Sequence, residues 1–216
     1  IYLSELDIEK SVINMIQNSL ENLKIEQLHS VLLHNSKDLI GKNSQKIYKA
    51  LCKSREEGLT KKIGISVYSP EETFTIFDEF DLDIVQLPLN ILDQRFKSSK
   101  CLEFLHSRGV DIHVRSVFLQ GLLLMRREDI PIKFNRWNEV WDSWYNWLED
   151  TEIDALSACL ASISGDPNVE SVVVGIESNQ QLIELMEAEI KKTVIHVPNF
   201  YLDSELLLNP SNWSGL

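Results

Sequence analysis

Short apolar runs alternate with longer amphipathic stretches along this chain of 216 residues. The apolar runs are rich in Val, Ile and Leu, lack strict alternation, and cover residues 29–35, 61–68, 83–90, 111–118 and 171–176. Buried strands that are separated by helices are typical of a parallel sheet covered on both faces. The pattern therefore predicts an α/β fold.

The helical stretches carry recognisable end signals. Gly58 closes the stretch 43–58, and Ser69 followed by Pro70 opens the helix after the second strand. A further helix is predicted before the first strand, because one face collects the apolar residues Ile8, Val12, Ile16 and Leu20, with Met15 and Leu23 beside them.

Two architectures fit strands and helices in this order: an open doubly wound sheet and a closed (β/α)₈ TIM barrel. The open sheet usually carries a G-x-G-x-x-G turn after a strand, and this sequence has none. We therefore favour the barrel. Five strand–helix units are visible where eight are needed, so we expect residues 1–216 to form a single domain that is the C-terminal part of the barrel, with the remaining units outside this chain.

Composition excludes several classes of protein. The chain has 33 acidic and 21 basic residues, a net charge of −12, which would repel nucleic acid and anionic membranes. No apolar run is long enough to cross a bilayer. The three cysteines are widely spaced and form no zinc pattern, so we expect no metal site and reduced thiols in a cytoplasmic protein.

Every predicted strand turns polar at its C-terminal end, where TIM barrels collect their chemistry. A single buried Ser or Gln is more often a hydrogen-bonded core residue than a ligand. Five convergent cases nevertheless favour a binding site, and they explain why Arg115 and Ser116 interrupt an apolar run. The polar positions are His34, Asn35, Ser66, Gln86, Asn90, Arg115, Ser116, Glu177 and Ser178, with Gly175 beside the last two.

Four segments resemble the aldo-keto reductase family, in the family's order: "SLENLKIEQLHSVLLHN", "GLTKKIGISVYSPEE", "DIVQLPLN" and "VVVGIESNQQLIE". The resemblance implies a (β/α)₈ barrel that binds NADP(H) or NAD(H) without a Rossmann turn. It also implies hydride transfer from the nicotinamide to a carbonyl substrate, with a tyrosine as proton donor.

The resemblance also implies roles for individual residues. His34 would be catalytic, binding the substrate's carbonyl oxygen, although a core histidine is the alternative. Ser66 and Gln86 would hold the nicotinamide carboxamide. The other residues implied to bind cofactor are Arg115 as a ring-stacking platform, Ser116 near the pyrophosphate, and Gly175, Glu177, Ser178, Gln181 and Glu184 around the adenosine.

The sequence departs from the family pattern at several positions. An asparagine is replaced by Val67, the stacking tyrosine by Arg115 and a late asparagine by Leu185. Glu177 stands where many members have a basic residue for the 2′-phosphate of NADP, which favours NAD(H).

The family's catalytic Asp, Tyr and Lys fall on strands that would precede Ile1. We therefore expect a carbonyl reductase only in full-length form, acting on an aldehyde or ketone with a sugar derivative as one candidate. A non-catalytic cofactor-binding or regulatory module is the alternative, because residues 1–216 contain no match to these three groups.

A stripe of Trp137, Trp141, Trp144 and Leu148 recurs at helical spacing between the fourth and fifth strands. We expect it to pack a helix against the sheet. In the alternative, one tryptophan borders the substrate site.

Overall fold

The computed structural model describes residues 5–191, 198, 200, 202 and 204–216, which group into two compact units. Unit 1 contains the described residues up to Leu87 together with Glu103–His113. Unit 2 contains Pro88–Leu102 and the described residues from Val114 onward. The expectation of a single domain stays a prediction.

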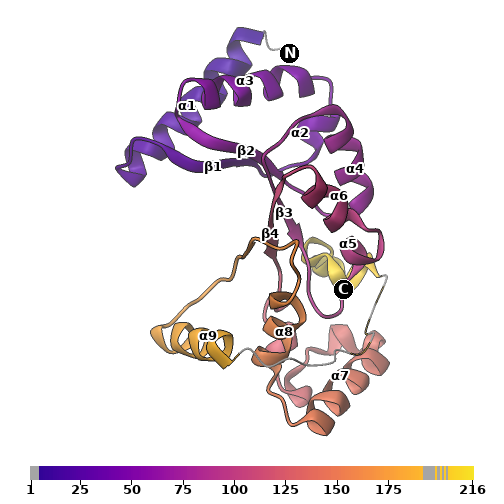
Figure 1. Cartoon of the computed structure of the whole chain (residues 1–216). Helices are drawn as coiled ribbons and strands as arrows, with labels where there is room; N and C mark the ends of the chain where they lie inside the picture. Colours follow the sequence, from indigo (N-terminus) through magenta and orange to yellow (C-terminus); the bar gives the residue numbers. More distant parts are fainter. Residues whose placement is uncertain (1–4, 192–197, 199, 201, 203) are drawn as a thin grey trace. The chain divides into compact units, whose positions relative to one another are not determined.

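Unit 1 is a parallel sheet with helices. Its elements are α1 (Glu5–Leu23), β1 (Leu28–Leu33), α2 (Lys37–Ile40), α3 (Ser44–Glu56), β2 (Thr60–Ser66), α4 (Pro70–Glu79), most of β3 (Ile84–Pro88), most of α6 (Cys101–Ser107) and the start of β4 (Asp111–Arg115). The strands follow the order β1-β2-β3-β4, and β2 is parallel to both β1 and β3. Helices α1 and α3 lie side by side (Figure 1).

The first helix buries a narrower face than the sequence predicts. Ile8, Ile16 and Leu20 are buried, whereas Met15 is 70% exposed and Leu23 60% exposed. Neighbouring helical residues point about 100° apart, so Met15 cannot share the direction of Ile16. The prediction is confirmed for Ile8, Ile16 and Leu20 and was wrong for Met15 and Leu23, while Val12 is half-buried.

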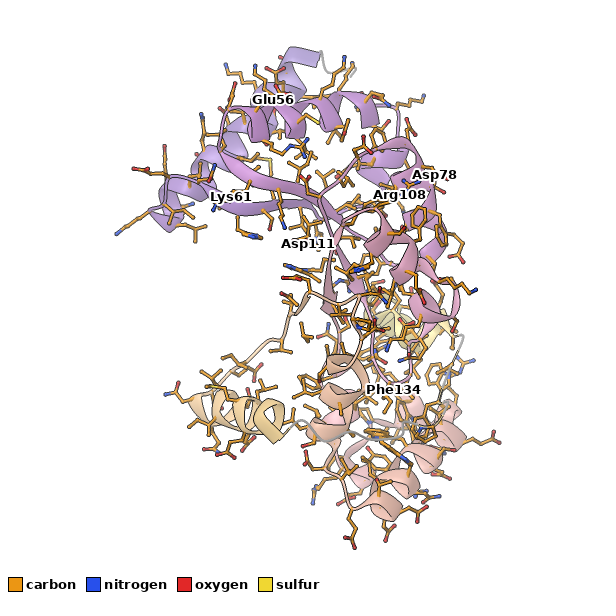
Figure 2. All side chains as sticks on the ribbon, viewed as in Figure 1. Glu56, Lys61, Asp78, Arg108, Asp111 and Phe134 are labelled. Atoms are coloured by element: carbon orange, nitrogen blue, oxygen red, sulfur yellow. The ribbon has the colours of Figure 1, made fainter. Side chains whose placement is uncertain are left out.

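Helix α4 begins where the sequence predicts. The Ser69 hydroxyl accepts the Glu72 N–H at 3.3 Å, the Glu72 carboxylate accepts the Ser69 N–H at 3.0 Å, and Pro70 is the first helical residue. Arg108, after α6, pairs with Asp78 of α4 at 3.5 Å and lies over the Phe104 ring (Figure 2). These contacts join α4 to the end of α6.

Unit 2 is mostly helical. Its elements, besides the end of β3, the start of α6 and the end of β4, are α5 (Arg95–Ser98), η1 (Leu122–Leu124), η2 (Arg127–Asp129), η3 (Ile132–Trp137), α7 (Asn138–Thr151), α8 (Ala155–Ser164), β5 (Ser171–Val172), α9 (Asn179–Lys191), α10 (Glu205–Leu208) and η4 (Pro210–Gly215). β5 follows β4 in the sheet order, and the Val173 N–H donates to the Val114 carbonyl at 2.7 Å.

The strands are shorter than the apolar runs that predicted them. The fourth ends at Arg115, because Ser116 turns to φ +61° and the chain then makes a tight turn before η1. A left-handed residue cannot continue a strand. The fifth covers only Ser171–Val172 of the predicted 171–176.

The tryptophan stripe packs inside unit 2. Trp137, Trp141 and Trp144 are 9%, 2% and 0% exposed, so all three are buried, while the packing of this stripe against the sheet stays a prediction. Trp144 also stacks on Trp147, with ring centroids 5.7 Å apart. Cys52 and Cys159 form no disulfide with another described residue, and burial raises the pKa of the Cys159 thiol.

Candidate cofactor and active site

The ends of β1, β2 and β3 place three predicted site residues in a row within unit 1. Ser66 and Gln86 are register partners on adjacent parallel strands, so their side chains point to the same face of the sheet. His34 follows Leu33, whose partner Ile65 directly precedes Ser66. The row therefore runs across three neighbouring strands, which are about 4.8 Å apart in parallel sheets.

These three side chains keep their hydrogen-bonding groups available. His34 is exposed, Gln86 half-buried and Ser66 5% exposed, and among the described residues none of the three side chains hydrogen-bonds to another group. A glutamine amide both donates and accepts, and it matches a carboxamide ligand in both respects.

The loops after β1 and β2 are tied together through Glu72. The Ser36 hydroxyl, two residues after His34, donates to the Glu72 carboxylate at 2.7 Å. The other oxygen of that carboxylate accepts the N–H groups of Tyr68 and Ser69. The backbone around His34 is therefore fixed relative to the end of the neighbouring strand.

A second group of predicted residues borders a cavity of about 760 Å³ in unit 2. The predicted cofactor residues that line it are Arg115, Ser116, Gly175, Glu177, Gln181 and Glu184. Apolar side chains, among them Phe118, Leu156 and Leu185, complete the wall. Concave sites with an apolar wall and a few polar groups are typical of small-molecule binding.

The loop before α9 is organised by its own polar side chains. The Gln181 Oε1 atom accepts the Glu177 N–H at 2.7 Å, and the Ser178 hydroxyl accepts the Gln181 N–H at 3.2 Å. Ser178 is not among the residues that line the cavity. Its hydroxyl instead receives an N–H at the start of α9, so its expected contact with the adenosine stays a prediction.

The opposite wall of the cavity is the turn after β4. Arg115 Nη1 donates to the Ser116 hydroxyl at 3.3 Å, and the amide of Asn90 donates to the Ser116 carbonyl at 3.1 Å. Sequence reasoning placed Asn90 at a strand end and assigned it no role. Its place at the end of an apolar run marked Asn90 as a candidate, but nothing in the sequence indicated that it contacts Ser116.

The charges on the lining are mixed. Arg115 supplies a cation, and Glu177 and Glu184 supply carboxylates. A pyrophosphate group pairs with a guanidinium and is repelled by carboxylates. Arg115, which the family pattern would have as a tyrosine, is therefore the lining residue best suited to an anion.

Two of the described tyrosines, Tyr48 and Tyr145, donate their hydroxyls to backbone carbonyls. The Tyr145 hydroxyl donates to the Met125 carbonyl at 2.9 Å, and burial raises its pKa to about 12. The Tyr48 hydroxyl donates to the Asp81 carbonyl at 3.1 Å, and burial raises its pKa as well. Tyr2 and Tyr201 lie outside the described residues.

Within the part of the chain that the structure describes, no three His, Cys, Asp or Glu side chains gather as metal ligands. None of the described helices combines the length and the apolar character that crossing a membrane requires.

Residues 4–195 match the sequence pattern of the Aldo/keto reductase family, and the chain belongs to that family. This confirms the resemblance that the four sequence segments carry. A comparison with curated protein sequences returned no match.

Solved structures of aldo-keto reductases share the fold. The apo form of AKR11C1 from Bacillus halodurans matches with a TM-score of 0.69 at 20% identity, over 94% of this chain and 66% of that one. Its holo form matches with a TM-score of 0.68 at 19% identity, over 91% and 65%. The thermostable aldo-keto reductase Tm1743, in complex with the inhibitor epalrestat, matches with a TM-score of 0.63 at 17% identity, over 84% and 61%. The chain thus spans about two thirds of the length of these proteins.

Proposed function

We propose that the whole protein uses NADH or NADPH to reduce an aldehyde or ketone to an alcohol, with a sugar derivative as one candidate substrate. The observation that carries the proposal is the cavity of unit 2, where six residues expected to bind cofactor meet in a member of the aldo-keto reductase family. We also propose that the five strand–helix units belong to a (β/α)₈ barrel.

The proposed roles follow the positions of the side chains. Arg115 and Ser116 bind the pyrophosphate, and the loop from Gly175 to Gln181 with Glu184 binds the adenosine part. Ser66 and Gln86 hold the carboxamide, which fixes the face of the nicotinamide ring. The bound dinucleotide supplies a hydride to the carbonyl carbon.

His34 acts on the other end of the carbonyl bond. An imidazole N–H donates a hydrogen bond to the carbonyl oxygen, and this bond strengthens as negative charge develops there. The proton that completes the alcohol needs a separate acid. The hydroxyls of Tyr48 and Tyr145 donate to backbone carbonyls. As the family resemblance implies, we propose that a tyrosine outside residues 1–216, with its Asp and Lys, supplies the proton.

The competing function is a module that binds the dinucleotide without turning it over. Both functions are tested by titrating the whole protein with NADH and NADPH, followed by nicotinamide fluorescence, and then by assaying a panel of small aldehydes and aldoses. Binding with turnover supports the reductase, and binding without turnover supports the module. No binding contradicts both.

Gln86→Ala should weaken dinucleotide binding by roughly 1 to 3 kcal/mol, because the carboxamide loses a partially buried partner that both donates and accepts. Fluorescence titration measures the change. Gln45→Ala is the matched control, since Gln45 is an exposed glutamine on α3 that contacts Glu79. Equal affinities for Gln86→Ala and the wild type would remove Gln86 from the site.

NADH should bind at least as tightly as NADPH, because the Glu177 carboxylate lies at the cavity and repels an added phosphate. Glu177→Gln should raise NADPH affinity by about two- to fivefold, the range for an exposed charge pair, and leave NADH affinity unchanged. Glu187→Gln, an exposed change on α9, the helix that follows Glu177, is the control. A wild-type preference for NADPH would show that Glu177 lies elsewhere in the complex.

A further inference from the structure

Asn90 is a buried amide that uses both ends of its side chain. It is 1% exposed and lies two residues beyond the end of β3. Its Oδ1 atom accepts the N–H groups of Leu92 and Asp93, each at 2.9 Å. Its Nδ2 atom donates to the Ser116 carbonyl at 3.1 Å. One side chain thus closes a local turn and reaches across to the neighbouring chain segment.

The contact with Ser116 extends the ladder between β3 and β4. The Leu89 N–H donates to the Arg115 carbonyl at 3.2 Å. Among the described residues, this is the last backbone hydrogen bond between the two segments toward their C-terminal ends. Ser116 then adopts φ +61°, a conformation that costs a residue other than glycine about 1 kcal/mol or more. The Asn90 amide supplies the next hydrogen bond, at the residue where the backbone leaves the strand. It therefore stabilises a conformation that Ser116 would not adopt by itself.

A buried ion pair holds the loop that carries Asn90. The Asp93 side chain is 0% exposed and forms a bidentate pair with Arg95, at 2.8 Å to Nε and 2.9 Å to Nη2. The Asp93 carboxylate accordingly raises the pKa of Arg95. Arg95 also reaches Glu205 of α10 at 3.1 Å. Asn90 is therefore held on a loop that is itself fixed by a buried ion pair.

We infer that Asn90 is a positioning residue for cofactor binding: its amide holds the Ser116 turn in the shape that forms one wall of the unit 2 cavity. The inference rests on the proposed function, because it assigns Asn90 to the dinucleotide site. Asn90 acts through Arg115 and Ser116, which line the cavity, and is not itself a lining residue.

Two variants of Asn90 remove the hydrogen bond that its amide donates and keep an oxygen that can accept. Asn90→Ser keeps an oxygen that can accept from the local turn, but it is too short to reach Ser116. Asn90→Asp keeps the accepting oxygen and turns a carboxylate oxygen toward the Ser116 carbonyl. Each variant should weaken dinucleotide binding about tenfold, measured well below its melting temperature. The matched control is Ser54→Ala, which removes a buried hydrogen bond in α3, and it should lower the melting temperature without changing affinity.

Hydrogen exchange of the ligand-free protein gives a second measurement. Amides of Val117–Gly121 should exchange faster in Asn90→Ser than in the wild type, while those of β1 and β2 stay unchanged. Wild-type affinity retained by Asn90→Ser, or unchanged exchange in the turn, would overturn the inference. If the wild type binds no dinucleotide, the proposed function fails, and with it the assignment of Asn90 to a cofactor site. The exchange data would then report only whether Asn90 holds the turn.

Discussion

His34→Gln in the whole protein is expected to slow carbonyl reduction by about a hundred- to a thousandfold, with cofactor affinity and melting temperature nearly unchanged. The loss corresponds to about 2.7 to 4 kcal/mol of barrier, typical of removing one donor to a developing oxyanion. His34 is exposed at the end of β1, and its side chain hydrogen-bonds to no other described residue. Removing the imidazole should therefore change the stability of the fold little.

The measurement is kcat for aldehyde reduction, accompanied by dinucleotide titration and thermal melting. His29→Gln is the matched control, because His29 is also exposed and lies on the same strand. We expect this control to retain turnover. Full turnover in His34→Gln, or unfolding of that variant, would make His34 a structural residue and would leave the reductase without its proposed electrophile.

Gly64→Ala should destabilise the protein by about 3 kcal/mol, the upper end for overpacking a buried site. Gly64 is buried in β2 opposite Ile84 of β3, and an added Cβ would overlap the Ile84 carbonyl oxygen and lie 2.9 Å from its carbonyl carbon. A flexible side chain could move aside, but strand backbone cannot do so without parting the sheet. Two residues further on, Ser66 would shift against Gln86, so dinucleotide binding should weaken as well.

Urea denaturation of the variant and the wild type measures the change in the free energy of unfolding. Gly165→Ala is the control: Gly165 has φ −97° and open space where a Cβ would stand. This variant should be as stable as the wild type. Equal stability for Gly64→Ala would mean that β2 and β3 are further apart than the structure has them.

The sequence alone was enough to predict the alternation of strands and helices, the start of α4 and the family. These features have local causes. Ser69, Pro70 and Glu72 lie within four residues of one another and cap α4 without help from the rest of the chain. An apolar run predicts a buried strand whichever neighbouring strand it pairs with. The sequence also indicated the strand-end residues, because parallel strands bring their C-terminal ends to the same edge.

The tertiary structure decided which polar strand-end residues lie next to one another. Register sets Ser66 beside Gln86 and His34 on the next strand, and no spacing along the chain encodes register. The positive φ of Ser116 ended the fourth strand early, against a sequence that reads as strand up to residue 118. The Ser116 carbonyl accepts a hydrogen bond from the amide of Asn90, which is 26 residues away along the chain. Position 64 likewise requires glycine because Ile84 on the neighbouring strand lies close to it. Ile84 is distant in sequence, so the spacing of apolar residues does not reveal this requirement.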